Sequence, residues 1–296
     1  MPEMNNEREL LYNEQISRNI GLISREEQRE IRNTPIAILG LGGLGGSVVE
    51  QLVRVGCENI VICDNDKFDR SNLNRQICSV SDIGKDKVKV IEKLVFEINP
   101  NVNLVSFKDV SQRNVNDMLN NVRVVALTLD DPYACIRVTR FCKKMKIDVI
   151  ESYGIPYLWV WWFTNKNIDY ETCYNLNTNE ITLEEIENIP NFMNNFYQAL
   201  LSILLKLPEI QSIYNRQKGV LKEILEGKRP LVSLAPIVRM SASFIAFEII
   251  LSGILKIKEK VLAPNIVGYD YFHMKSINLK IQNSKIGTNS IIDKKT

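Results

Sequence analysis

A glycine-rich loop between two regular elements constrains the fold of this chain more than any other feature. The stretch AILGLGGLGGSVVEQLVRVG, residues 37–56, carries Gly40, Gly42 and Gly45 in the pattern GxGxxG between an apolar run and a helical pattern. Asp64 ends the next apolar run, at about the 20-residue spacing typical of a ribose-binding acid. The stretch predicts a strand, a phosphate-binding loop, a helix and a second strand, because amides at a helix N-terminus attract phosphates whatever nucleotide carries them.

Strand and helix patterns continue to alternate after this unit. The near-continuous apolar runs in NIVICDND, VNLVSF, VRVVALTLD and IDVIES are typical of buried parallel strands, and helical patterns separate them. The alternation predicts an α/β fold with a doubly wound, mostly parallel, Rossmann-like sheet. An N-terminal helical arm precedes this sheet, and a C-terminal extension of helices and antiparallel strands follows it.

The flanking regions divide the chain further. Residues 6–32 have an amphipathic helical pattern that ends before Pro35, and Trp159, Trp161 and Trp162 are typical of a core strand. We predict an arm over residues 1–34 and a nucleotide-binding core over 35–165. The C-terminal part of the same domain covers 166–285 with a helical insertion at 182–228, and a flexible tail covers 286–296.

Composition excludes several classes of partner. With 37 basic and 35 acidic residues, the net charge of +2 does not favour a nucleic-acid or anionic-membrane surface. The start, MPEMNNEREL, is polar, and the best apolar candidate, SFIAFEIILSGIL, contains Glu248 and is shorter than the roughly 18 to 20 residues of a membrane span. We therefore expect a cytoplasmic protein that binds neither nucleic acid nor membrane.

The cysteines do not form a metal-binding pattern. The six cysteines stand at 57, 63, 78, 135, 142 and 173, and no two of them are spaced as CxxC. Cysteines in apolar strand and helix patterns behave as small hydrophobic residues. We expect reduced, structural thiols and no zinc site.

The residues after Asp64 distinguish between nucleotides. The stretches NDKFDRSNLNRQ and SDIGKDKVKV place Asn72, Arg75 and Lys87 close behind that acid. A dinucleotide dehydrogenase has no use for this set, whereas a triphosphate that reacts at its α-phosphate needs cations and amide donors. The later strand ends in TLDD, where Asp130 can hold the Mg²⁺ that accompanies ATP. The pattern favours ATP over NAD.

The chain resembles the adenylating enzymes of the ThiF, MoeB and ubiquitin-activating superfamily over roughly residues 12–175 and 230–282. The resemblance rests on six motifs in this order: GLGGLG, DND, SNLNRQ, GKDKV, INP and TLDD. The resemblance implies that ATP lies on the glycine loop, with the ribose at Asp64, the phosphates at Asn72, Arg75 and Lys87, and Mg²⁺ at Asp130. The residues that it predicts for ATP binding are Gly40, Gly42, Gly43, Gly45, Asp64, Asp66, Asn72, Arg75, Lys87 and Asp130.

The chain also departs from the family pattern. In this family an arginine from the N-terminal arm of the partner subunit reaches the phosphates, usually within a pattern like RYxRQ. Here Glu14 follows YN, so the pattern is altered, and we assign the role of this arginine to Arg18. This assignment implies a homodimer. The alternative is that Arg18 is a solvated residue on a helix face. The two zinc-binding CxxC pairs of some members are missing, and Cys173 is the one candidate for a nucleophilic thiol, with a packed thiol as the simpler interpretation.

The predicted reaction is attack of a substrate carboxylate on the α-phosphate of Mg·ATP, with Arg18, Arg75, Lys87 and Asp130 as the catalytic residues. The resemblance implies a protein or peptide C-terminus as substrate, such as that of a ubiquitin-like or sulfur-carrier protein; the near-neutral charge disfavours the branch that acts on a tRNA base. Residues 182–228 either shape the acyl-substrate groove or embellish the packing. A non-catalytic nucleotide-binding scaffold and an NAD-dependent oxidoreductase remain as alternatives.

Overall fold

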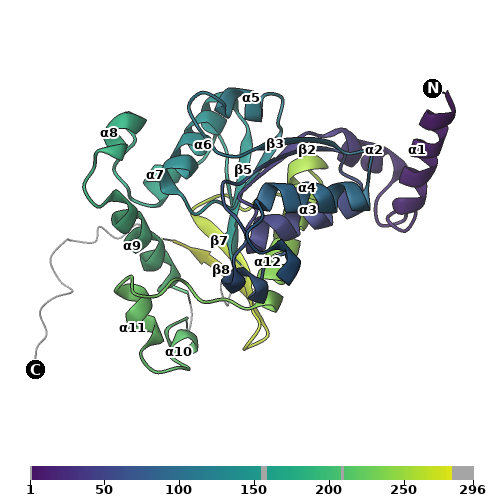
Figure 1. The fold of residues 1–296 in the computed structure, drawn as a ribbon. Coiled ribbons are helices and arrows are strands. Elements are labelled where there is room, and N and C mark those ends of the chain that lie inside the picture. Colours follow the sequence, from purple (N-terminus) through teal and green to yellow (C-terminus); the bar gives the residue numbers. More distant parts are fainter. Residues whose placement is uncertain (1, 155–158, 208–209, 282–296) are drawn as a thin grey trace, which may run out of the picture.

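A mixed sheet of eight strands runs through the part of the chain that the structure describes (Figure 1). The structure is a computed structural model and describes residues 2–154, 159–207 and 210–281; the predicted tail at 286–296 lies outside them. The strand order is β3-β2-β1-β4-β5-β6-β7-β8. The strands are β1 (Ile36–Leu39), β2 (Asn59–Cys63), β3 (Asn103–Phe107), β4 (Val124–Leu127), β5 (Asp148–Tyr153), β6 (Trp159–Phe163), β7 (Asn265–Asp270) and β8 (Lys275–Lys280).

The first five strands are parallel and the last three are antiparallel. All residues of β1 and β4 are buried, as the continuous apolar runs predicted for strands covered on both faces. The predicted α/β class, with a mostly parallel sheet and an antiparallel C-terminal extension, is confirmed. The proposed division into arm, core, C-terminal part and tail stays a prediction.

Helices cover both faces of the sheet (Figure 1). One apolar cluster joins the sheet to α3, α4 and α12, and the other joins it to α5, α6, α7 and α9. The helices are α1 (Pro2–Gln15), α2 (Arg25–Asn33), α3 (Gly43–Val55), α4 (Lys87–Ile98), α5 (Val115–Leu119), α6 (Pro132–Met145), α7 (Tyr170–Cys173), α8 (Leu183–Glu187), α9 (Phe192–Leu204), α10 (Ile210–Tyr214), α11 (Val220–Leu225) and α12 (Ala235–Glu248). Two short 3₁₀ turns, η1 (Arg70–Asn74) and η2 (Val80–Asp82), lie between β2 and α4, and a π-helical segment, η3 (Ile249–Ile254), continues α12.

The N-terminal arm consists of two helices joined by turns, where the pattern had predicted helix throughout residues 6–32. The capping box of Ser24 and Glu27 begins α2 and so separates it from α1. Side chains of the arm donate hydrogen bonds to carbonyl groups at the C-terminal end of α3: Gln15 to Val53 (2.7 Å), Gln28 and Asn19 to Val55 (2.9 and 3.0 Å), and Tyr12 to Gly56 (3.1 Å). The arm is therefore fastened to the carbonyls of the last turn of α3, where helical hydrogen bonding ends.

The tryptophans of β6 belong to the core, as predicted. Trp159, Trp161 and Trp162 are each at most 1% exposed. Trp161 lies in the cluster of α6 and α7, whereas Trp162 lies in the cluster of α3 and α12. The strand therefore fills both faces of the sheet.

The helix formed by α12 and η3 corrects one expectation. Residues Ala235–Ile254 are long and apolar enough, by length and composition, to cross a membrane, although the pattern had indicated a shorter run. In the structure 61% of its apolar window is buried within the protein. Glu248, 3% exposed, accepts hydrogen bonds from Trp162 (3.0 Å) and Ser252 (2.9 Å) and pairs with Lys258 (2.6 Å). We therefore interpret this apolar helix as a core helix, in which the buried charge of Glu248 is hydrogen-bonded and paired.

Candidate functional site

A cavity of about 240 Å³ lies at the carboxyl ends of β1 and β4. These two strands are neighbours, and the chain runs outward from them in opposite directions across the sheet, which makes this crevice the usual ligand position of a doubly wound fold. We call it the glycine-loop cavity. It brings together most of the residues predicted from the motifs, namely Gly40, Gly42, Gly43, Asp64, Asp66, Arg75, Lys87 and Asp130.

The glycine loop needs its glycines for close packing. Gly40 has φ +94°, and a Cβ there would come within 2.6 Å of the carbonyl carbon of Thr128 at the end of β4. A Cβ on Gly45 would overlap the carbonyl oxygen of Gly40. Gly45 thus lies beneath the loop and supports it, where the motif had predicted a contact with the nucleotide. Gly42 begins α3 without a side-chain cap, so the first amides of that helix are free of side-chain capping.

Asp64 is held firmly against the loop. Its Oδ2 accepts the amide of Leu41 at 2.6 Å and its Oδ1 accepts the amide of Asp66 at 2.8 Å. The residue is 9% exposed. A carboxylate with two fixed backbone donors keeps its orientation and still has acceptor capacity for hydroxyl groups in the cavity.

Two cations from different elements line the same cavity. Lys87, the first residue of α4, places its Nζ 2.8 Å from Asp66 Oδ2 and 4.0 Å from Asp64 Oδ1, and its side chain is 7% exposed. Arg75 follows η1, and its Nη1 donates to Asn74 Oδ1 at 2.8 Å. The lysine is a largely desolvated charge, which acts more strongly on a phosphate than an exposed one.

The SNLNRQ motif contributes differently from the prediction. Asn72 belongs to the capping box of η1, where its Oδ1 accepts the amide of Asp69 at 3.2 Å, and it lies outside the lining of the cavity as described. Gln76, which sequence reasoning missed, lines the cavity. Gln76 is 9% exposed, and its Oε1 has no hydrogen-bond partner among the described residues. The sequence signal that could have identified Gln76 as a site residue is its position directly after Arg75 in the SNLNRQ motif.

The two acids of TLDD have different places. Asp131 accepts the amide of Tyr133 at 2.9 Å and so caps α6. Asp130 is exposed and lines the glycine-loop cavity. Of this pair, Asp130 is the one that the described lining of the cavity includes.

Arg18 lies far from the cavity of its own chain. It is an exposed residue in the turns after α1, and the arm is fastened to the C-terminal end of α3, whereas the glycine loop begins that helix. The 13 residues of α3 span roughly 20 Å at about 1.5 Å per residue. Arg18 is accordingly not among the described residues that line the cavity.

A second cavity of about 730 Å³ adjoins the first. We call it the side chamber. The two share Leu44, Thr128, Leu129, Asp130, Tyr153 and Leu231. The remaining wall comes mainly from β5, from α9 and from residues 227–231. The insertion predicted at 182–228 therefore does form part of a cavity beside the glycine loop.

Glu151 in the wall of the side chamber is a buried carboxyl with four donors. It is 3% exposed, and it accepts hydrogen bonds from Tyr174 (2.7 Å), Trp161 (2.8 Å), Tyr170 (3.1 Å) and Tyr153 (3.2 Å). Burial raises the pKa of Glu151 from 4.5 to about 7, although these hydrogen bonds oppose the shift. The carboxyl fixes Tyr153, which borders both cavities.

We expect Glu151→Gln to remove a pH dependence of stability. In the folded chain Glu151 keeps its proton up to about pH 7, whereas in the unfolded chain it releases the proton near pH 4.5. The free energy of unfolding therefore falls as the pH rises through this range, by up to about 1.4 kcal/mol per pKa unit. Denaturant unfolding of both proteins should therefore show the wild type losing stability relative to Glu151→Gln between these pH values. Exposed Glu180→Gln is the control, and a constant difference for Glu151→Gln would contradict the buried-acid interpretation.

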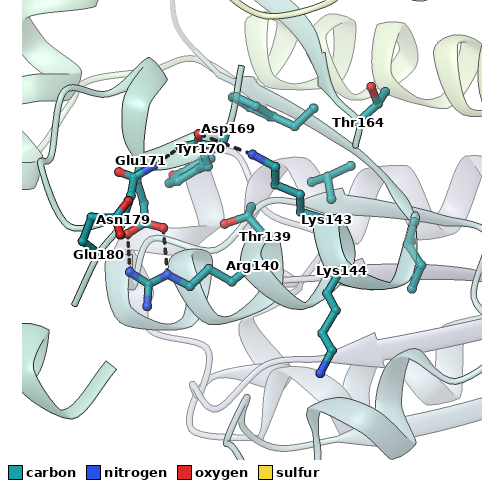
Figure 2. Close-up of a pocket in the computed structure, with 13 residues that line it drawn as sticks. Thr139, Arg140, Lys143, Lys144, Thr164, Asp169, Tyr170, Glu171, Asn179 and Glu180 are labelled. Carbon is teal, nitrogen blue, oxygen red and sulfur yellow. Dashed lines mark hydrogen bonds and ion pairs between the residues drawn. The ribbon is translucent and has the colours of Figure 1, made fainter. Parts of the chain in front are cut away.

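A third cavity, of about 530 Å³, lies beside α6 and α7 (Figure 2). Arg140 binds Glu171 through two hydrogen bonds, of 2.8 and 2.6 Å, and Lys143 lies 3.4 Å from Asp169. These charges are already compensated within the chain, and the glycine loop is not part of this lining. Two of the three cations in the described lining are therefore paired, and the cavity has no glycine loop to bind phosphates.

Cys173 is a packed thiol. It ends α7, is 2% exposed, and burial raises its pKa. Because the thiolate is the nucleophile, this environment opposes covalent chemistry at Cys173.

Comparison with known proteins supplies the remaining findings. A sequence model described as the ThiF family matches residues 12–288. The chain is 35% identical over 143 residues to the tRNA threonylcarbamoyladenosine dehydratase of Bacillus subtilis, which covers 47% of this chain and 56% of that protein. It is 27% identical over 158 residues to the molybdopterin-synthase adenylyltransferase of Haemophilus influenzae, which covers 52% and 64%. The chain thus spans little more than half the length of these curated relatives.

The same architecture occurs in a solved structure. Escherichia coli MccB with ATP aligns over 88% of this chain and 68% of that chain, with a TM-score of 0.57 and 21% identity. At this identity the likeness establishes the shared fold.

Proposed function

The chain belongs to the ThiF family, and from this premise we propose that it is an ATP-dependent adenylyltransferase that activates a substrate carboxylate as an acyl-adenylate and releases pyrophosphate. One observation carries the proposal: Asp64, Arg75, Lys87 and Asp130, from four separate segments, line a single cavity on the glycine loop. Adenylation requires these groups together, because a nucleotide must be bound and the charge of its phosphates neutralised.

The polar groups that line the cavity match those that an ATP molecule needs for binding. The uncapped amides of α3, Lys87 and Arg75 would hold the phosphates. Asp64 would accept hydrogen bonds from the ribose, with Asp66 beside it, and the unpartnered Oε1 of Gln76 would accept a further one from the nucleoside. The fit supports a nucleoside triphosphate in this cavity.

The reaction itself needs mainly positioning and charge. A carboxylate oxygen of the substrate forms a bond to the α-phosphorus, and the bond from that phosphorus to the bridging oxygen breaks, so pyrophosphate leaves with the electron pair. Lys87 and Arg75 stabilise the charge that develops on the phosphoryl oxygens. Asp130 would hold Mg²⁺, which when bound supplies further neutralisation at the departing pyrophosphate.

We propose a homodimer in which Arg18 acts on the partner's site. The distance along α3 separates Arg18 from its own glycine loop, so a second chain has to supply it. Leu10, Leu11 and Leu22 in the same arm are exposed large hydrophobic residues, as expected of a surface that a second copy covers. Phosphate-stabilising arginines are effective when a partner delivers them in this way.

The substrate class has two candidates. The first is a protein or peptide C-terminus, including that of a ubiquitin-like or sulfur-carrier protein. The second is a carboxylate on a tRNA base, which the name of the Bacillus subtilis relative supports and the net charge of +2 does not. Because Cys173 is packed, we propose that in either case the adenylate passes directly to an acceptor without a thioester.

Pyrophosphate exchange and calorimetry test this function. We expect Mg·ATP to bind and NAD not to bind, and labelled pyrophosphate to exchange into ATP when the correct carboxylate is present. The carboxylates to compare are peptides ending in different residues and tRNA that carries threonylcarbamoyladenosine. NAD binding would favour an oxidoreductase, and ATP binding without exchange for any carboxylate would favour a non-catalytic scaffold.

A further inference from the structure

We infer that the side chamber receives the acyl part of the substrate, and that this part carries a large apolar group next to the carboxylate. The inference rests on the proposed function and names its substrate class. Its first support is continuity, because the chamber and the glycine-loop cavity share Asp130, Thr128 and Tyr153. A carboxylate at the shared wall would face the nucleotide while its substituent enters the chamber.

The size and the lining of the chamber indicate which kind of substituent next to the substrate carboxylate would bind there. Its volume of about 730 Å³ lies within the roughly 300 to 1,000 Å³ typical of small-ligand sites. Phe196, Leu200 and Met193 of α9 line it together with Leu127 and Pro132. A terminal glycine would leave this space unfilled, whereas each buried methylene strengthens binding by roughly fourfold. The chamber therefore favours a bulky apolar residue over glycine.

Polar residues in the wall of the chamber favour a neutral amide beside the carboxylate. Ser152 Oγ and Tyr197 OH belong to lining residues, and both atoms are buried without a hydrogen-bond partner among the described residues. Glu151 has its acceptor sites filled by four donors, so it offers no free lone pair to a substrate ammonium group. The chemistry that fits is an N-acylated apolar amino acid, either free or at the end of a peptide.

Calorimetry with defined probes tests the inference. The probes are N-acetyl-phenylalanine, N-acetyl-glycine and two heptapeptides that differ only in a final Phe or Gly, each titrated into the full chain with and without Mg²⁺ and a non-hydrolysable ATP analogue. We expect at least one Phe probe to bind about tenfold or more tightly than its Gly counterpart. Binding of both Phe probes indicates that a free acid suffices, and binding of the peptide alone indicates a peptide substrate.

Two exposed positions of α9 provide a matched pair of variants. Met193 lines the chamber and Asn195 does not, and both side chains are exposed, so tryptophan at either position leaves the core unchanged. We expect Met193→Trp to weaken binding of the Phe probe by about tenfold or more without changing the affinity for the ATP analogue, and Asn195→Trp to change neither.

Several results would overturn the inference: equal affinity for the Phe and Gly probes, no binding of either Phe probe, or equal effects of the two tryptophans. Failure of the proposed function has a different signature. If the wild-type chain does not bind the ATP analogue but still binds a Phe probe in a manner sensitive to Met193→Trp, adenylation is refuted while the chamber retains its ligand.

Discussion

We expect Lys87→Met to lower the rate of pyrophosphate exchange by at least about a hundredfold, because it removes the buried cation that we propose to bind the phosphates. Methionine keeps an unbranched stem of similar length, so the packing of this 7% exposed side chain at the start of α4 is largely retained. Asp66 loses its partner but remains 57% exposed, and Asp64, 4.0 Å from the lysine, keeps its two backbone donors, which limits the cost to stability.

The measurement combines exchange rates with thermal denaturation. Lys89→Met is the matched control, because Lys89 lies two residues further along α4 with a 65% exposed side chain that pairs with Glu92. The control should retain its exchange rate, and both variants should unfold close to the wild-type temperature. An exchange rate for Lys87→Met within about threefold of the wild type would remove Lys87 from the catalytic set.

Mixed dimers are expected to regain activity that neither parent has. We expect Arg18→Ala and Asp130→Ala each to abolish exchange, since every site in either homodimer lacks one required group. When the two proteins are mixed and allowed to exchange subunits, half of the dimers are mixed, and in each of these one site carries both lesions and the other carries neither. Recovered activity should approach about a quarter of the wild-type level if the sites act independently.

The controls separate this arrangement from its alternatives. Arg25→Ala removes another exposed cation of the arm and should remain active alone. If Arg18 acts within its own chain, every site in the mixture keeps one lesion and no activity returns. An active Arg18→Ala homodimer would assign Arg18 to a solvated surface, and a monomer in sedimentation at working concentration would refute the shared site.

The features that could be predicted from the sequence depend on short-range patterns. The glycine loop, Asp64 at the end of β2, and Lys87 at the start of α4 follow from residues within one strand–helix–strand unit. Parallel strands bring their carboxyl ends to one edge of the sheet, so the topology alone places Asp130 near the loop. Eight of the ten residues predicted for ATP binding line the glycine-loop cavity.

Other features depend on contacts between segments that no local pattern relates. Ser233 and Val238 reach the glycine-loop cavity from near the start of α12, and the hydroxyl of Ser233 donates to the carbonyl of Gly154. Asn72 was predicted at the phosphates as an amide donor and from the family resemblance, but its side-chain oxygen belongs to the capping box of η1. Glu151 stood in an ordinary strand pattern, and its four donors come from β5, β6, α7 and the residue that follows α7.

The docking of the arm on α3 determines where the chain can be shortened or labelled. Residues from Tyr12 to Gln28 donate hydrogen bonds to carbonyls at the last turn of α3, and the first turn of the same helix lines the glycine-loop cavity. Cleavage after Gln28 would leave carbonyls of Val53, Val55 and Gly56 without these donors, and fraying from that end would reach the glycine loop through a single helix. A fluorophore or affinity label attached before Glu9 avoids these contacts, so it can report on subunit exchange without loosening the nucleotide site.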